Sequence, residues 1–146
     1  MGKKTIDKIK KDFSWVKQAS QIFSVLLFGS VSKKENHRRS DIDIALVIPG
    51  LSNFYFDCKN MSHEAVDASK ILRKTFRKVN TVSFNYDVHI FEELPLCIQM
   101  NIIKQHKIIY TMDRYGMYEY FFHYRKLWAD QKYRNTMSKE FLLSTI

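Results

Sequence analysis

Residues 24–48 read SVLLFGSVSKKENHRRSDIDIALVI, and this stretch decides how the chain is expected to fold. It holds two apolar runs, residues 24–28 and 42–48, each short and nearly continuous, as is typical of buried strands. The first run ends at Gly29-Ser30, and polar residues fill the space before the second. The stretch therefore predicts two strands joined through a polar loop, with a glycine turn where the first strand ends.

Aspartates mark the start of the second strand. Asp41 and Asp43 are two apart, so their carboxylates project from the same side of the sheet. Carboxylates this close repel unless a cation neutralises them, and Mg²⁺ suits because it takes carboxylates together with substrate phosphates. The alternating residues 82–91 predict a third strand whose polar face carries Asp87, which could complete a site for two such ions. The alternative is that these are solvated aspartates at strand starts.

The Gly29-Ser30 turn is the other half of this predicted site. A glycine there allows close backbone approach, while exposed amides and the Ser30 hydroxyl can donate to phosphate oxygens. Lys33 lies in a basic loop that could also contact phosphate, and Ser40 could bind there or only cap the turn before Asp41. Triphosphate on the turn and metal on the carboxylates together predict a nucleotide site.

Helical spacing of apolar residues fills most of the remaining chain. Helices are expected over residues 4–21, 62–79 with Ser62 as its cap, 95–105, and 114–143 with a break near 135–138. Residues 108–110 predict a small edge strand. Aromatic residues on nearly every side of the last helix fit either a groove of its own domain or another protein chain in a homo- or hetero-oligomer.

Two further features, His89 and the basic face of the 62–79 helix, each allow more than one interpretation. His89 lies two residues beyond Asp87 on the same strand face, where it is expected to be a hydrogen-bonded surface histidine that could also touch substrate or metal. The other face of the 62–79 helix is basic and is expected to be solvated, although it remains a candidate strip for RNA or an acidic partner.

The amino-acid composition limits the fold and function classes that the chain could have. The 146 residues are 45% hydrophobic with only four Gly and two Pro, which excludes disorder and argues against a turn-rich all-β fold. A net charge of +9 favours a polyanionic partner such as a nucleotide, a nucleic acid or an acidic protein. Two distant cysteines suggest neither a zinc site nor a disulfide framework, and the chain holds no apolar run long enough for a membrane span. We therefore expect one soluble, cytoplasmic domain.

Gly29-Ser30, ten residues, and then Asp41-Ile42-Asp43, with Asp87 on a later strand, resembles the active-site signature of the DNA polymerase β nucleotidyltransferase superfamily. The short chain is similar to its minimal nucleotidyltransferases over about residues 5–110. The resemblance implies an α/β (α+β) nucleotidyltransferase fold, with helices packed on a small mixed sheet. Residues 1–146 would then form a single domain with a helical extension over about 111–146.

The resemblance also implies a function. Gly29 and Ser30 would hold the phosphates of ATP, while Asp41, Asp43 and Asp87 would bind Mg²⁺ and Asp87 would assist deprotonation of the acceptor hydroxyl. Such proteins are commonly antitoxins paired with a HEPN-domain toxin, and some add AMP to a toxin tyrosine. Two alternatives remain open: a binding module that silences its partner by contact alone, and a terminal transferase that extends RNA.

Overall fold

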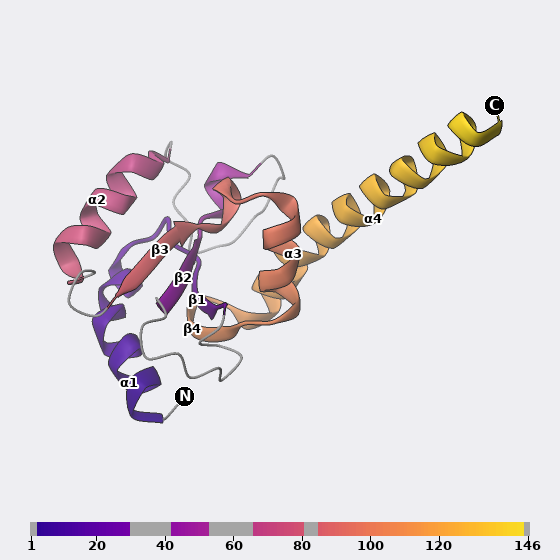
Figure 1. The fold of residues 1–146 in the computed structure, drawn as a ribbon. Helices are drawn as coiled ribbons and strands as arrows, with labels where there is room; N and C mark the ends of the chain where they lie inside the picture. Colours follow the sequence, from indigo (N-terminus) through magenta and orange to yellow (C-terminus); the bar gives the residue numbers. More distant parts are fainter. Residues whose placement is uncertain (1–2, 30–41, 53–65, 81–84, 145–146) are drawn as a thin grey trace.

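The computed structural model describes residues 3–29, 42–52, 66–80 and 85–144, and within them four strands form one mixed sheet (Figure 1). The strands are β1 (Ser24–Phe28), β2 (Ile42–Val47), β3 (Tyr86–Ile90) and β4 (Lys107–Thr111), in the order β3-β2-β1-β4. Strand β1 pairs antiparallel with β2 and β4, while β2 and β3 run parallel. The predicted small mixed sheet is confirmed, and so is the edge position of β4.

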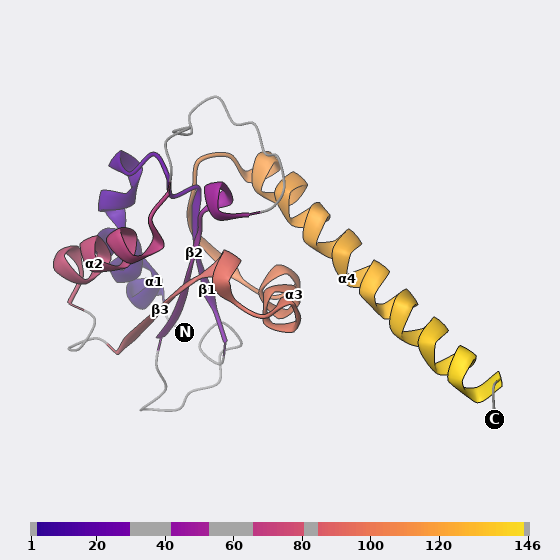
Figure 2. The same ribbon diagram turned by 90° about the horizontal axis from the view of Figure 1, so that it is seen from above.

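Both faces of the sheet are apolar in the central strands, which explains why these strands read as continuous rather than alternating runs. On one face, Leu27 and Ile44 pack with residues of α1 (Lys3–Asp12), and α2 (Ala68–Lys78) lies against the same cluster. On the other face, Leu26 and Ala45 pack with residues of α3 (Leu96–Lys104) and α4 (Arg114–Ser144). Figure 2 shows the sheet between these two helical layers.

The first helix is shorter than expected. The predicted helix over residues 4–21 is wrong beyond Asp12, because α1 ends there and a 3₁₀ helix, η1 (Ser14–Gln18), follows. The tighter turn still brings Phe13 and Val16 into the core. The Asp12 carboxylate accepts a 2.6 Å hydrogen bond from the hydroxyl of Tyr86, so this junction is tied to β3.

The second helix also begins later than residue 62. Val66 and Asp67 precede α2, and the Asp67 side chain caps it by accepting from the amides of Ser69 and Lys70 at 3.0 and 3.4 Å. The expected cap, Ser62, lies outside the described residues. Exposed basic residues line α2 as the sequence predicted: Lys70, Arg73, Lys74, Arg77 and Lys78.

The third strand is shorter than residues 82–91. Asn85 has a φ of 52°, in the left-handed region, so the described part of this segment becomes a strand only at Tyr86. At its other end, Phe91 begins a short 3₁₀ helix, η3 (Phe91–Glu93). The alternation is confirmed within β3, because Tyr86 and Ile90 enter the core of the α1 face while Asp87 and His89 point to the opposite face.

The last helix is continuous, so the predicted break near residues 135–138 is wrong. The first half of α4 packs on the sheet through the buried side chains of Tyr120, Phe121 and Tyr124. Their face also meets Glu92, whose carboxylate accepts from the Ile48 amide at 2.6 and 3.0 Å. Beyond this anchor, α4 runs outward past the sheet (Figure 1).

Among the helices that the structure describes, none has both the length and the apolar character needed to cross a membrane.

Candidate functional site

Three strands bring the predicted site residues together at one edge of the sheet. Phe28, the last residue of β1, pairs with Asp43 near the start of β2, and Asp43 pairs with Asp87 near the start of β3. Asp43 alternates with Ile44, so it lies on the face covered by α3 and α4. Two carboxylates predicted to meet from different strands are therefore direct neighbours across the sheet.

Gly29 leaves the space that the Asp43 carboxylate occupies. A Cβ built on Gly29 would collide with the Asp43 Oδ2 atom and lie 3.2 Å from its Cγ. The glycine also has a φ of 80°, a backbone conformation that other residues adopt only with strain. The positive φ favours glycine at this position whatever the space, and the close contact places the turn directly against the Asp43 carboxylate.

His89 completes a cluster around the two aspartates. Its Nε2 atom lies 2.9 Å from Asp87 Oδ2, and its ring packs against the ring of Phe28 with centroids 6.0 Å apart. One ligand atom from each of Asp43, Asp87 and His89 lies within 4.8 Å of the others. The histidine is thus hydrogen-bonded, as expected. It also belongs to the one cluster, among the described residues, that offers three metal-ligating groups close together.

This donor set fits a divalent cation. Two carboxylates supply hard oxygen ligands, the kind Mg²⁺ prefers, and a positive ion would offset their mutual repulsion. The cluster is half-buried, with the side chains of His89 and Asp87 35% and 47% exposed, so a substrate phosphate could reach the same ion. The residues present are therefore compatible with the metal that the sequence predicts.

A groove adjoins this cluster on the side of β1. A cavity of about 380 Å³ is lined by Phe28 and Gly29 on one side and by α3 with its C-cap on the other, through Ile98, Asn101, Lys104 and the cap residue Gln105. The sequence predicts a helix over residues 95–105 but no site residue on it, so these groove residues were missed. Ile98, Asn101 and Lys104 are spaced three residues apart on one face of α3, but nothing in the sequence indicates that this face meets Gly29.

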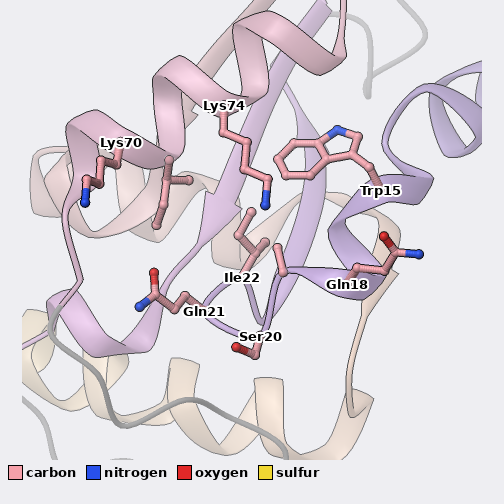
Figure 3. Close-up of a pocket in the computed structure, with 9 residues that line it drawn as sticks. Trp15, Gln18, Ser20, Gln21, Ile22, Lys70 and Lys74 are labelled. Atoms are coloured by element: carbon pink, nitrogen blue, oxygen red, sulfur yellow. The ribbon is translucent and has the colours of Figure 1, made fainter.

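A second cavity lies on the opposite face of the sheet. Figure 3 shows it between η1 and α2, with Trp15, Ile22 and Lys74 among its lining side chains, and its volume is about 300 Å³. The Lys74 Nζ atom lies 5.9 Å from the centre of the Trp15 ring. Because Trp15 and Ile22 belong to the core on the α1 face, the sheet separates this cavity from Asp43 and Asp87.

The remaining predicted site residues are Ser30, Lys33, Ser40 and Asp41, and all of them lie outside the described residues. Their assigned roles stay predictions. Of the predicted set, the structure describes Gly29, Asp43 and Asp87, and it brings these three together.

Comparisons with known proteins identify the family of this chain. Residues 8–115 match the family described as Polymerase beta, Nucleotidyltransferase. The chain is 39% identical over 116 residues to a candidate protein adenylyltransferase of Methanocaldococcus jannaschii, a match that spans 79% of this chain and 76% of that protein.

Solved structures share the fold at low sequence identity. A chain from a crystal structure of a toxin–antitoxin with AMP-PNP aligns with a TM-score of 0.55 and 16% identity, over 84% of this chain and 92% of the other. A chain from a complex of tri-AMPylated Shewanella oneidensis HEPN toxin with MNT antitoxin aligns with a TM-score of 0.53 and 16% identity, over 90% and 93%. The match to the family over most of the chain, together with the paired aspartates, shows that the chain belongs to the polymerase beta nucleotidyltransferase family and is a nucleotidyltransferase.

Proposed function

We propose that this protein transfers AMP from ATP to a hydroxyl side chain of a HEPN-type toxin, and that it is the antitoxin of that pair. The observation that carries the proposal is the Asp43–Asp87 pair set directly against the Gly29 turn. The relative from M. jannaschii, named as a candidate protein adenylyltransferase, supports protein as the acceptor. The S. oneidensis complex, in which the toxin is AMPylated, supports a toxin as the partner.

Metal dependence follows from the same pair of carboxylates. A divalent metal ion, most simply Mg²⁺, held by Asp43 and Asp87 with Asp41 as a further ligand, would offset the charge of the triphosphate and polarise its α-phosphorus. Gly29 leaves room for the carboxylate and for close approach of the phosphates, with Ser30, Ser40 and Lys33 as further phosphate contacts.

The chemistry is a displacement at the α-phosphorus. The acceptor oxygen forms a new bond to this phosphorus while the bond to pyrophosphate breaks, and pyrophosphate leaves. Asp87 is the carboxylate to which we assign the proton of the acceptor hydroxyl. His89 holds Asp87 Oδ2 at 2.9 Å, which leaves the other oxygen of this carboxylate for substrate or metal.

The partner would dock on the exposed aromatic side of α4. Tyr115, Tyr118, Phe122 and Tyr133 are 73%, 45%, 57% and 66% exposed. Their spacing of three, four and eleven residues places them on one face of the helix, opposite the buried Tyr120, Phe121 and Tyr124. Exposed aromatic residues concentrated in this way are typical of protein interfaces.

Silencing by contact alone is a second candidate, because the same aromatic face could block a toxin without any transfer. In a contact-only antitoxin, a variant carrying both Asp43→Asn and Asp87→Asn would still inhibit the toxin. The exposed free thiol of Cys97 fits the reducing cytoplasmic setting that we expect for either function.

The deciding experiment combines the purified protein with its HEPN partner, ATP and Mg²⁺ and follows the intact mass of the partner. A gain of one or more AMP groups, lost on chelation of the metal and in Asp43→Asn, supports the proposal. An unchanged mass together with full toxin inhibition contradicts it in favour of the contact-only antitoxin.

A further inference from the structure

We propose that the groove between Gly29 and α3 is the subsite that reads the nucleobase, and that Asn101 and Gln105 hydrogen bond to adenine. This inference rests on the proposed function, since it concerns the nucleotide used at the same site. It assigns a role to a helix that otherwise only covers the sheet.

Position is the first argument. Gly29 lines the groove and also abuts the Asp43 carboxylate, so the groove opens directly beside the proposed phosphate and metal positions. A nucleoside is joined to its α-phosphate by a single ester link, so its base must lie close to where that phosphate is held. The volume of about 380 Å³ falls within the range of small-molecule sites.

The lining is the second argument. Phe28 and Ile98 supply apolar surface, with Ile98 37% exposed, while Asn101 and Gln105 supply amides. Ligand sites commonly combine such apolar walls with a few polar groups that fix orientation. Both amide side chains are exposed, and neither forms a hydrogen bond with another described residue.

The amides favour adenine over other bases. Each presents one donor and one acceptor, and this pair matches the N6 amino group and N7 of adenine. Asn101 lies on α3, and Gln105 is the residue that caps the C-terminal end of this helix, where its backbone amide donates to the Asn101 carbonyl at 3.0 Å. Both side chains line the same groove and can approach the same base. Lys104 also lines the groove, and a lysine would favour either guanine O6 and N7 or a phosphate, which makes these ligands the competing outcomes.

Equilibrium binding separates these possibilities. The full-length protein is titrated in Mg²⁺ with ATP, GTP and inorganic tripolyphosphate, alongside the variant Asn101→Ala/Gln105→Ala. We expect the wild-type protein to bind ATP more tightly than GTP, and the double variant to bind ATP about tenfold more weakly with tripolyphosphate binding unchanged. Gln18→Ala, an exposed amide that lines the other cavity, is the matched control and should bind all three ligands normally.

Three results would overturn the subsite. They are a wild-type preference for GTP, an equal loss of ATP and tripolyphosphate binding in the double variant, and no loss of ATP binding at all. The transfer assay distinguishes this failure from that of the proposed function. If the double variant binds ATP normally while Asp43→Asn abolishes transfer to the partner, only the subsite is wrong. If no transfer occurs but the double variant selectively loses ATP binding, the subsite stands and the proposed function fails.

Discussion

Asp43 and Asp87 are paired neighbours on the parallel strands β2 and β3, although the whole of α2 lies between them in the chain. This register gives the two carboxylates a common face of the sheet, next to the turn at Gly29. Strand pairing thus positions the two proposed metal ligands through the backbone, so removing either charge should affect chemistry far more than folding.

Gly29→Ala should damage both stability and transfer. The added methyl group collides with the Asp43 carboxylate, and a φ of 80° costs a non-glycine residue roughly 1–2 kcal/mol. Urea unfolding should show that the free energy of unfolding falls by at least this amount. In a protein that already carries Asp43→Ala, Gly29→Ala should lower the free energy of unfolding by less, because the carboxylate with which the methyl group collides is gone. Equal costs in the two backgrounds would mean that Gly29 and the carboxylate do not interact.

His89→Ala should slow transfer about 10- to 100-fold without unfolding the protein. The variant loses the 2.9 Å contact that holds Asp87 Oδ2, and partners that orient metal-binding carboxylates typically contribute on this scale. Steady-state kinetics measures the effect, with His123→Ala, an exposed histidine on α4, as the control. If both variants match the wild-type rate, His89 has no positioning role.

The pairing of Asp43 with Asp87 illustrates what the sequence could predict. The two apolar runs, the glycine between them and the alternation of β3 are local patterns, and they correctly placed three strands and the shared face of Asp87 and His89. The junction between α1 and η1 depends on packing instead, because Tyr86 from β3 holds Asp12 there. The spacing of residues 6 to 16 alone could not show where the α-helix ends.

Contacts between segments far apart in the chain could not be predicted from local sequence patterns. The groove at Gly29 requires α3 and its C-cap to lie beside the end of β1, which no local pattern specifies. Glu92 is a similar case, because a glutamate followed by a second glutamate gives no sign that its carboxylate will accept from the Ile48 amide inside the fold. The left-handed Asn85 was also missed, since the alternating pattern continues through it.

Glu92 should make stability fall as the solution becomes alkaline. Burial raises the pKa of its carboxyl from 4.5 to about 8, against the lowering effect of the Ile48 amide. A raised folded-state pKa means that this contribution to stability is fully present below pH 4.5 and is lost as the pH rises through about 8. The free energy of unfolding should therefore fall across this window by up to about 1.4 kcal/mol per pH unit.

Glu92→Gln tests this assignment, since the amide oxygen can still accept from Ile48 while the side chain no longer titrates. Chemical unfolding at several pH values should show a flatter profile for the variant than for the wild type. Parallel profiles from pH 5 to 8 would show that Glu92 is not the group responsible.

Substitution of the exposed aromatic face of α4 should weaken the proposed complex with a HEPN-type toxin and leave the fold intact. Tyr118 and Phe122 are 45% and 57% exposed and neither belongs to the buried core, so the double variant Tyr118→Ser/Phe122→Ser loses interface area and the ring contact of Tyr118 with His106 rather than a buried core side chain. We expect at least about a tenfold loss of affinity by calorimetry, with an unchanged melting temperature. Phe76→Ser on α2, where the side chain is 54% exposed, is the matched control. Equal affinities for both variants would place the interface elsewhere.

The most direct test of the account follows the α-phosphate of ATP. The protein is incubated with the proposed HEPN-type partner, a divalent metal and ATP radiolabelled at either the α- or the γ-phosphate, and the partner is then isolated under denaturing conditions. The account predicts stable label on the partner from α-labelled ATP only, and none with the Asp43→Asn or Asp87→Asn protein, although both variants remain folded. Label from γ-labelled ATP, or full α-labelling by the variants, would contradict nucleotidyl transfer at the Asp43–Asp87 pair.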